Sequence, residues 1–309
     1  MNFSFEILPP PRWETINDVK PTLSELVEFN PTEIAVTTHA HVRDKKTGVV
    51  VKKRPGTHML CAVIQHEYNV PTRAHILRRY FDDEETEDYL RDLYFANINK
   101  VLAITGDDKG ALRPHIMNNN NANQYSLELV KQIVNMNNNV YISKKLVDTE
   151  PTNFEIGIAC YPEGHLISQK KGLTLEDEVH NYVLPKVEAG ANSMITQMFF
   201  DNQHFLNFND VCNGAGINIP LIPGIKILSN KDVKNNNLKG LTSLFNVSIP
   251  KKLETDLVQA TSYVNSMQIG VEHAANQVEE LYDAGMKDFH IFIMGPKRLY
   301  ELKKFMKRI

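Results

Sequence analysis

The chain has 309 residues, of which 42% are hydrophobic and 23% charged, and its formal net charge is -3. This length and apolar content suffice for one large buried core, whereas the charge gives no bulk attraction to nucleic acid or anionic lipid. No basic leader, no apolar run of roughly 18 residues and no CxxC pair is present, so we expect a cytoplasmic protein of one domain (1–309) without a membrane span or metal site.

The first part of the chain alternates apolar runs with segments of helical periodicity. Residues 2–8 predict a strand that ends at three prolines, because proline lacks an amide donor. A helix over 14–29 and a strand over 33–38 follow. The basic, glycine-containing stretch 39–55 is expected to be a loop, and the next helix covers 57–68.

The same alternation continues to the end of the chain. An acidic segment after the third strand predicts a helix start, because negative charge there complements the helix macrodipole. Pro223 and Gly224 are expected to end the seventh strand. The further strands are predicted at 72–77, 100–105, 155–160, 192–199, 219–222 and 289–294, and the later helices at 126–136, 232–236, 241–245, 253–284 and 297–306. About eight strands separated by helices predict an α/β fold, a single-domain (β/α)8 TIM barrel.

Polar or aromatic residues of catalytic type stand at the ends of six of these strands: Glu6, Thr37, His75, Asp107, Tyr161 and Gln197. In (β/α)8 barrels the active site is built at the carboxyl ends of the strands. The pattern therefore predicts an enzyme with these side chains at one mouth of the barrel.

Six sequence blocks carry a family resemblance: FEILPP, ITGDD, ACYPEGH, VEAGANSMITQMFFD, IPGI and KDFHIFIM. In this order, over nearly the whole chain, they resemble the methylenetetrahydrofolate reductase family, of the bacterial type with the catalytic barrel only. The resemblance implies an eight-fold α/β barrel that binds FAD and takes electrons from NADH or NADPH. It also implies reduction of 5,10-methylenetetrahydrofolate to 5-methyltetrahydrofolate in one-carbon and methionine metabolism.

Glu6 is the predicted general acid. Reduction of the methylene bridge requires an aminal to open to an iminium ion, so the departing nitrogen needs a proton donor. A carboxyl group in a largely apolar mouth has its acid form favoured by desolvation, and the resemblance assigns Glu6 this role in substrate binding and catalysis. The alternative is a carboxylate that caps the barrel rim or accepts amide hydrogen bonds.

Asp107 and Gln197 are the other predicted substrate-binding residues. The resemblance places Asp107 beside both flavin and pterin, where it would tune both, and Gly106 would let the backbone approach a flat ring. An Asx turn or helix cap is the alternative for Asp107. Gln197 offers a paired donor and acceptor to the pterin edge, or is a buried glutamine satisfied by neighbouring strands.

The remaining predicted positions concern the cofactor. The resemblance implies that the flavin is bound by Thr37, His75, Thr105, Gly106, Asp107, Ala159, Tyr161, His165 and Lys186. Each of the aromatic, histidine and threonine positions could alternatively be a core, loop or hydrogen-bonded structural residue.

Several positions depart from the family pattern. Thr105 and the proline before Lys186 stand where arginines often contact the FAD phosphates, and Pro296 replaces an arginine that helps to hold the folate. Lys297 or Arg298 could substitute for the latter. One ammonium is not equivalent to planar bidentate donors, so hydride transfer without flavin is a variant of the main hypothesis.

Two further hypotheses stay open. One is folate-dependent one-carbon transfer on the same barrel with a corrinoid or redox partner subunit, and the other is a partner subunit that kept the fold without turnover. We expect a homo-oligomer with methylenetetrahydrofolate as the small-molecule partner.

Overall fold

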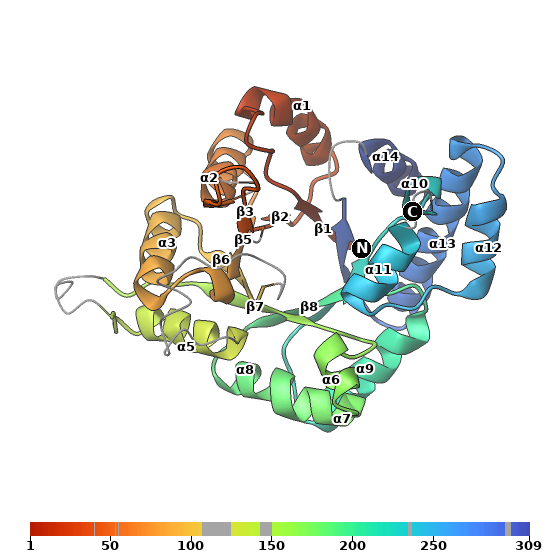
Figure 1. Cartoon of the computed structure of the whole chain (residues 1–309). Helices are drawn as coiled ribbons and strands as arrows, with labels where there is room; N and C mark the ends of the chain where they lie inside the picture. Colours follow the sequence, from red (N-terminus) through yellow and green to blue (C-terminus); the bar gives the residue numbers. More distant parts are fainter. Residues whose placement is uncertain are drawn as a thin grey trace. The chain divides into compact units, whose positions relative to one another are not determined.

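The computed structural model describes residues 1–39, 41–52, 54, 56–106, 125–142, 150–233, 237–293 and 298–309. Eight strands are hydrogen-bonded in the order β1-β10-β9-β8-β7-β6-β5-β2 and form a closed barrel, while β3 and β4 form a separate two-stranded sheet. Within the barrel, the pairings of β1 with β10, β10 with β9, β9 with β8, β2 with β5, β5 with β6 and β6 with β7 are parallel. The predicted (β/α)8 fold class is confirmed (Figure 1).

The chain divides into two compact units. Unit 1 contains Met1–Glu6, Cys160–Leu184 and Met194–Ile309, and unit 2 contains Ile7–Ala159 and Pro185–Ser193. None of the helices in the described ranges combines the length and apolar content that a membrane span requires.

Unit 2 is built on parallel strands that are buried on both faces. β2 (Glu33–Val36) pairs with β5 (Thr72–Leu77), β5 with β6 (Lys100–Ile104), and β6 with β7 (Glu155–Cys160). All residues of β2 and β5 are buried, the polar Thr72, Arg73 and His75 included. Their covering helices are α1 (Ile16–Val27), α2 (Thr57–Tyr68), α3 (Asp83–Phe95), α5 (Ser126–Asn137) and α8 (Leu184–Glu188), with a short 3-10 helix η1 (Arg78–Tyr80).

The start of α3 agrees with the acidic segment in the sequence. Asp82 accepts a hydrogen bond from the amide of Glu85, and the side chain of Glu85 accepts one from the amide of Asp82. This reciprocal capping box satisfies two amide groups that the first helical turn leaves without intrahelical partners.

The prediction that 39–55 is a loop is wrong for residues 41–43 and 50–52, which are strands. β3 (His41–Arg43) pairs antiparallel with β4 (Val50–Lys52). The turn between them is held by Asp44, whose Oδ1 accepts hydrogen bonds from the amides of Lys46 and Thr47 at 2.9 and 2.8 Å. Strands of three residues give too short an alternation to be recognised, and it is the Asp44 side chain that organises the hairpin.

Unit 1 contains β1 (Asn2–Ile7), β10 (Asp288–Phe292), β9 (Leu221–Ile225) and most of β8 (Ser193–Met198). The predicted end of the seventh strand is wrong, because β9 runs through Pro223 and Gly224. The β8–β9 register is irregular between Ile195 and Met198, so the missing amide donor of Pro223 falls where the ladder is interrupted. A Cβ on Gly224 would lie 2.3 Å from the carbonyl oxygen of Thr196, so the close strand contact requires glycine.

The helices of unit 1 pack on these strands around a core of Met198, Phe200, Leu228, Val247, Leu253 and Leu257. The single helix predicted over 253–284 is two helices, because Ser262 starts a new one by accepting a hydrogen bond from the amide of Asn265. The helices are α6 (Leu166–Lys170), α7 (Leu175–Glu178), the π-helix η2 (Val179–Val183), α9 (Asn202–Gly214), α10 (Asn230–Val233), α11 (Asn237–Phe245), α12 (Lys251–Gln259), α13 (Tyr263–Asp283) and α14 (Leu299–Arg308).

Candidate active site

The predicted site residues are divided between the two units. Unit 1 holds Glu6, Tyr161, His165 and Gln197, and unit 2 holds Thr37, His75, Thr105, Gly106, Ala159 and Lys186. Asp107 lies outside the described residues.

Glu6 is part of a row of hydrogen-bonding side chains on two neighbouring strands. β1 pairs with β10 so that Ser4 lies opposite His290, and Glu6 follows Ser4 on the same face of β1. His290 is fully buried; its Nδ1 lies 2.8 Å from Ser4 Oγ, and its Nε2 lies 3.4 Å from Glu6 Oε2. The row leads from Glu6, near the carboxyl end of β1, to the fully buried His290 of β10.

Ser4 orients the imidazole of His290. Its Oγ lies 2.8 Å from Nδ1 of His290 and 3.3 Å from the carbonyl oxygen of Phe289. The other ring nitrogen, Nε2, is thereby directed at Glu6 Oε2. A carboxyl group and an imidazole in hydrogen-bond contact can exchange a proton, which a general acid requires.

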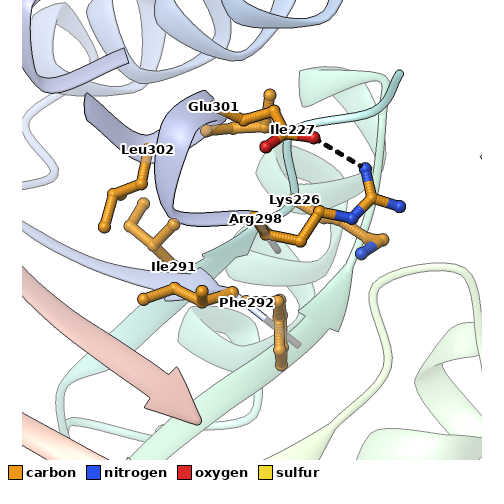
Figure 2. A pocket seen from close by; sticks show the side chains of 8 residues that line it. Lys226, Ile227, Ile291, Phe292, Arg298, Glu301 and Leu302 are labelled. Carbon is orange, nitrogen blue, oxygen red and sulfur yellow. Dashed lines mark hydrogen bonds and ion pairs between the residues drawn. The ribbon is translucent and has the colours of Figure 1, made fainter. Parts of the chain in front are cut away.

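A cluster of charged side chains lies at the carboxyl end of β9 in unit 1. Arg298 donates from Nη2 to Asp232 Oδ1 at 2.6 Å, and from Nη1 to Ser229 Oγ at 2.8 Å and Glu301 Oε1 at 3.2 Å. Arg298 and Glu301 line a pocket together with Lys226 and Phe292 (Figure 2). Arg298 is one of the two predicted substitutes for the family's folate-binding arginine, and its guanidinium is bonded to three protein groups. The other, Lys297, lies outside the described residues.

Lys226 is the member of this cluster that sequence reasoning missed. It directly follows β9 and is 4% exposed. Burial lowers the pKa of its ammonium; the nearby Asp232 and Glu6 oppose this shift, and the positive charge of Arg298 adds to it. A lysine immediately after an apolar strand was the available signal. The other missed residue is His290, on the last strand.

Gln197 lies within the irregular part of the β8–β9 ladder. Its Oε1 accepts a hydrogen bond from the amide of Met198 at 3.0 Å, so the side chain folds back onto its own strand. Bulges of this kind change the direction of a side chain next to active sites. Gln197 is half-buried, and its predicted pterin contact stays a prediction.

Tyr161 and His165 lie together after β7. Their rings are edge to face, with centroids 4.6 Å apart. His165 also begins α6, since its Nδ1 accepts from the amide of Ile167 at 3.2 Å, while its own amide donates to Glu178 Oε2 at 2.8 Å. These contacts fix the loop that carries both rings, and they give His165 a structural role whether or not it lines a flavin.

In unit 2, Thr37 and His75 are held by a set of threonine hydroxyls. Thr38 Oγ1 donates to the carbonyl oxygen of His75 at 2.6 Å, and Thr57 Oγ1 donates to that of Thr37 at 2.9 Å. Thr37 and His75 are both buried. The ends of β2 and β5 are therefore fixed to each other and to the start of α2.

Thr105 and Gly106 define the exit of β6. Thr105 Oγ1 accepts from the amide of Ser126 at 3.1 Å, at the first residue of α5. Gly106 has φ +97°, and a Cβ there would lie 2.9 Å from Cε2 of Tyr80, so only glycine fits this turn. Elsewhere in unit 2, Ala159 is half-buried on β7, and Lys186 is buried on α8.

Comparison with known proteins gives a consistent set of relatives. The profile of the family described as methylenetetrahydrofolate reductase matches residues 1–302. A 5,10-methylenetetrahydrofolate reductase of Buchnera aphidicola subsp. Baizongia pistaciae is 28% identical over 303 residues, which cover 97% of this chain and 88% of the relative. That of Escherichia coli K12 is 26% identical over 298 residues, with 96% and 86% coverage.

A solved structure has a similar fold at low sequence identity. It is an uncharacterized protein from Clostridium thermocellum that binds two copies of 5-methyl-5,6,7,8-tetrahydrofolic acid. The TM-score is 0.56 at 12% identity, with coverage of 100% of this chain and 96% of that one.

Proposed function

Because the chain belongs to the methylenetetrahydrofolate reductase family, we propose that it reduces 5,10-methylenetetrahydrofolate to 5-methyltetrahydrofolate with hydride from NADH or NADPH. The observation that carries the proposal is the Ser4–His290–Glu6 row, which holds a carboxyl group in contact with an imidazole near the carboxyl end of β1. The family relatives support methylenetetrahydrofolate reduction, and the C. thermocellum protein supports a folate ligand for this fold.

The chemistry needs one proton and one hydride. Glu6 would protonate the departing nitrogen of the aminal, so that its C–N bond breaks and the methylene carbon becomes part of an iminium ion. Hydride added to that carbon gives the N5-methyl group. His290, hydrogen-bonded to Glu6 and oriented by Ser4, would return a proton to the carboxylate after each turnover. In this proposal the side-chain amide of Gln197 hydrogen-bonds to the edge of the pterin, and the carboxylate of Asp107 stabilises the positive charge of the iminium ion.

We propose that FAD, when bound, carries the hydride from NADH or NADPH to the folate. Thr105 still has its hydroxyl proton to donate, and Lys186 supplies an ammonium, so these two residues would hold its phosphates. Thr37, His75, Gly106, Ala159, Tyr161 and His165 are the further residues proposed to bind it. With one ammonium in place of two guanidinium groups, we expect weaker FAD binding than in relatives that carry arginines there.

The setting of the reaction is also proposed. We place the enzyme in the cytoplasm, in one-carbon and methionine metabolism, as a homo-oligomer. A separate redox subunit would be needed only if the purified chain fails to accept electrons from both nicotinamides.

The decisive experiment is substitution of Glu6 by Gln. We expect Glu6→Gln to lower kcat for folate reduction by about 10²- to 10⁴-fold, because general acid catalysis contributes an effect of this size. Circular dichroism should show an unchanged fold, and Glu14→Gln, at an exposed position outside the row, should retain full activity. Unchanged kcat in Glu6→Gln would remove Glu6 from the acid role.

The visible spectrum of the purified protein distinguishes the flavin-dependent from the flavin-free variant. The departures at Thr105 and Pro185 are the observation that favours direct hydride transfer. A colourless protein that oxidises NADH or NADPH with methylenetetrahydrofolate would establish the flavin-free variant. A protein that binds folate without oxidising either nicotinamide would favour one-carbon transfer or a partner-subunit role.

A further inference from the structure

Lys226 is a buried cation without a bonded partner among the residues that the structure describes. In the part of the chain that the structure describes, no hydrogen bond or ion pair reaches its Nζ, although the side chain is 4% exposed. Its neighbours are charged, but their bonds are made elsewhere. Asp232 is bonded to Arg298 and to the amide of Ser229, and Glu301 is bonded to Arg298 and Lys231.

An ammonium in this condition destabilises the folded protein. Removing most of a charged side chain from water without giving it hydrogen bonds or a counter-ion is unfavourable, and proteins rarely keep such a group without a use. Lys226 lines the pocket between the end of β9 and the start of α14, together with Arg298 and Glu301 (Figure 2). This position is the one expected for an ammonium whose hydrogen bonds are made to a bound ligand.

The ligand group must be anionic and lie within reach of Glu6. β10 pairs with β9 on one side and with β1 on the other, with Gly224 opposite His290 and Glu6 opposite Phe292, so Lys226 and Glu6 lie at the same end of this group of strands in unit 1. The substrate of the proposed function carries its negative charge on the two carboxylates of its glutamate tail. The guanidinium of Arg298 is already bonded to Asp232. Pro296 stands where the family resemblance expects an arginine that helps to hold the folate. Among the charged side chains of this cluster, this leaves Lys226 to bind the tail.

We infer that Lys226 is a specificity-determining substrate-binding residue whose ammonium binds a carboxylate of the folate glutamate tail. The inference rests on the proposed function for the identity of the ligand, and on the unbonded ammonium for its charge. A nucleotide phosphate has related anionic chemistry, and the test separates it from the tail.

The test compares two substrates in three variants. The substrates are 5,10-methylenetetrahydrofolate and 5,10-methylenetetrahydropteroate, which lacks the glutamate. In Lys226→Met, KM for the folate should rise roughly 10- to 100-fold, as expected for loss of a hydrogen bond between charged groups, while KM for the pteroate stays constant. Lys226→Arg should restore most of the folate KM. Lys231→Met is the control, because Lys231 is bonded to Tyr263 and is 40% exposed, and it should change neither KM.

Two further readouts make the result decisive. Lys226→Met should raise the midpoint of thermal unfolding of the unliganded protein, which the loss of a merely structural lysine would lower. Equal changes of KM for both substrates, or a raised KM for NADH with an unchanged folate KM, would overturn the inference. If the wild-type protein does not turn over the folate, the proposed function fails, and titration of wild type and Lys226→Met with 5-methyltetrahydrofolate still tests the tail contact.

Discussion

Two buried cations, one in each unit, are in opposite states. Arg73 of unit 2 is 2% exposed and fully bonded: its Nε and Nη2 donate to the two oxygens of Glu33 at 2.6 and 3.1 Å, and Nη2 also donates to Glu155 at 2.7 Å. Lys226 of unit 1 is as deeply buried and forms no such bond in the described part of the chain. Burial alone therefore does not tell whether a charge serves stability or binding; its bonding state does.

The position of each cation along its strands agrees with this difference. Glu33, Lys100 and Glu155 are the first residues of β2, β6 and β7, and Arg73 is the second residue of β5. This network links the amino ends of neighbouring strands, the end of a (β/α)8 barrel whose residues contribute mainly to stability. Lys226 follows the carboxyl end of β9, the end at which active sites of such barrels lie. The planar fork of arginine suits the first task and the single ammonium of lysine suits the second.

Substitution of Arg73 by Met should have the largest effect on stability. Among the described residues, Lys100 at 3.1 Å would then be the one cation bonded to the buried carboxylate of Glu33, and the free energy of unfolding should fall by about 3–5 kcal/mol in urea denaturation. Lys252→Ala, which removes an exposed ion pair, is the control and should stay within about 0.5 kcal/mol of wild type.

The pH dependence of unfolding gives a second readout for this network. Burial raises the pKa of Glu33, but Arg73 and Lys100 more than offset this, so the pKa lies below its ordinary value of 4.5. The stabilisation is thus complete above pH 4.5 and is lost as the pH falls through the lower pKa of the folded state. This acid loss should be smaller in Arg73→Met. An unchanged acid limb would contradict the assignment.

Gly157→Ala should have an intermediate effect. A Cβ at this position of β7 would lie 2.9 Å from Nη1 of Arg73 and 3.1 Å from Cδ1 of Leu102. Because the bonded guanidinium cannot move freely, overpacking should cost about 1–3 kcal/mol. Gly214→Ala, where a Cβ has open space, is the matched control; equal urea midpoints for the two variants would show that the Arg73 network yields easily.

Lys226→Met should have the smallest effect on stability, and of opposite sign. Removal of an unbonded buried ammonium should stabilise the unliganded protein by about 1 kcal/mol. The pKa of Lys226 in the folded state lies below its ordinary 10.5, so wild type gains stability as the pH rises between the two values, and the advantage of the variant shrinks over that window. Destabilisation by the substitution would place Lys226 with Arg73 as a structural cation.

The sequence predicted local elements well where one physical signal dominated. The strands over 72–77 and 155–160 have the predicted bounds, because a short apolar run between polar turns leaves little choice. β9 was misplaced because Pro223 is compatible with a strand only through an irregularity in its neighbour, which local sequence does not reveal.

The candidate site shows a similar limit. Glu6 was identified from its position after an apolar run and from the family resemblance. Its partner His290 is 284 residues away, and only the β1–β10 register places it beside Ser4 and Glu6. Lys226 was missed for the same reason, since its unbonded state depends on how Arg298, Asp232 and Glu301 use one another.

The interrupted ladder beside Pro223 also affects how the barrel can assemble. If β9 slid by two residues along β8, Pro223 would face a carbonyl group that needs an amide, and the side chain replacing Gly224 would collide with Thr196. Misaligned pairings of these two strands are thus penalised twice. Pro223 and Gly224, which made the sequence predict the end of this strand, therefore restrict β9 to one register against β8 during folding.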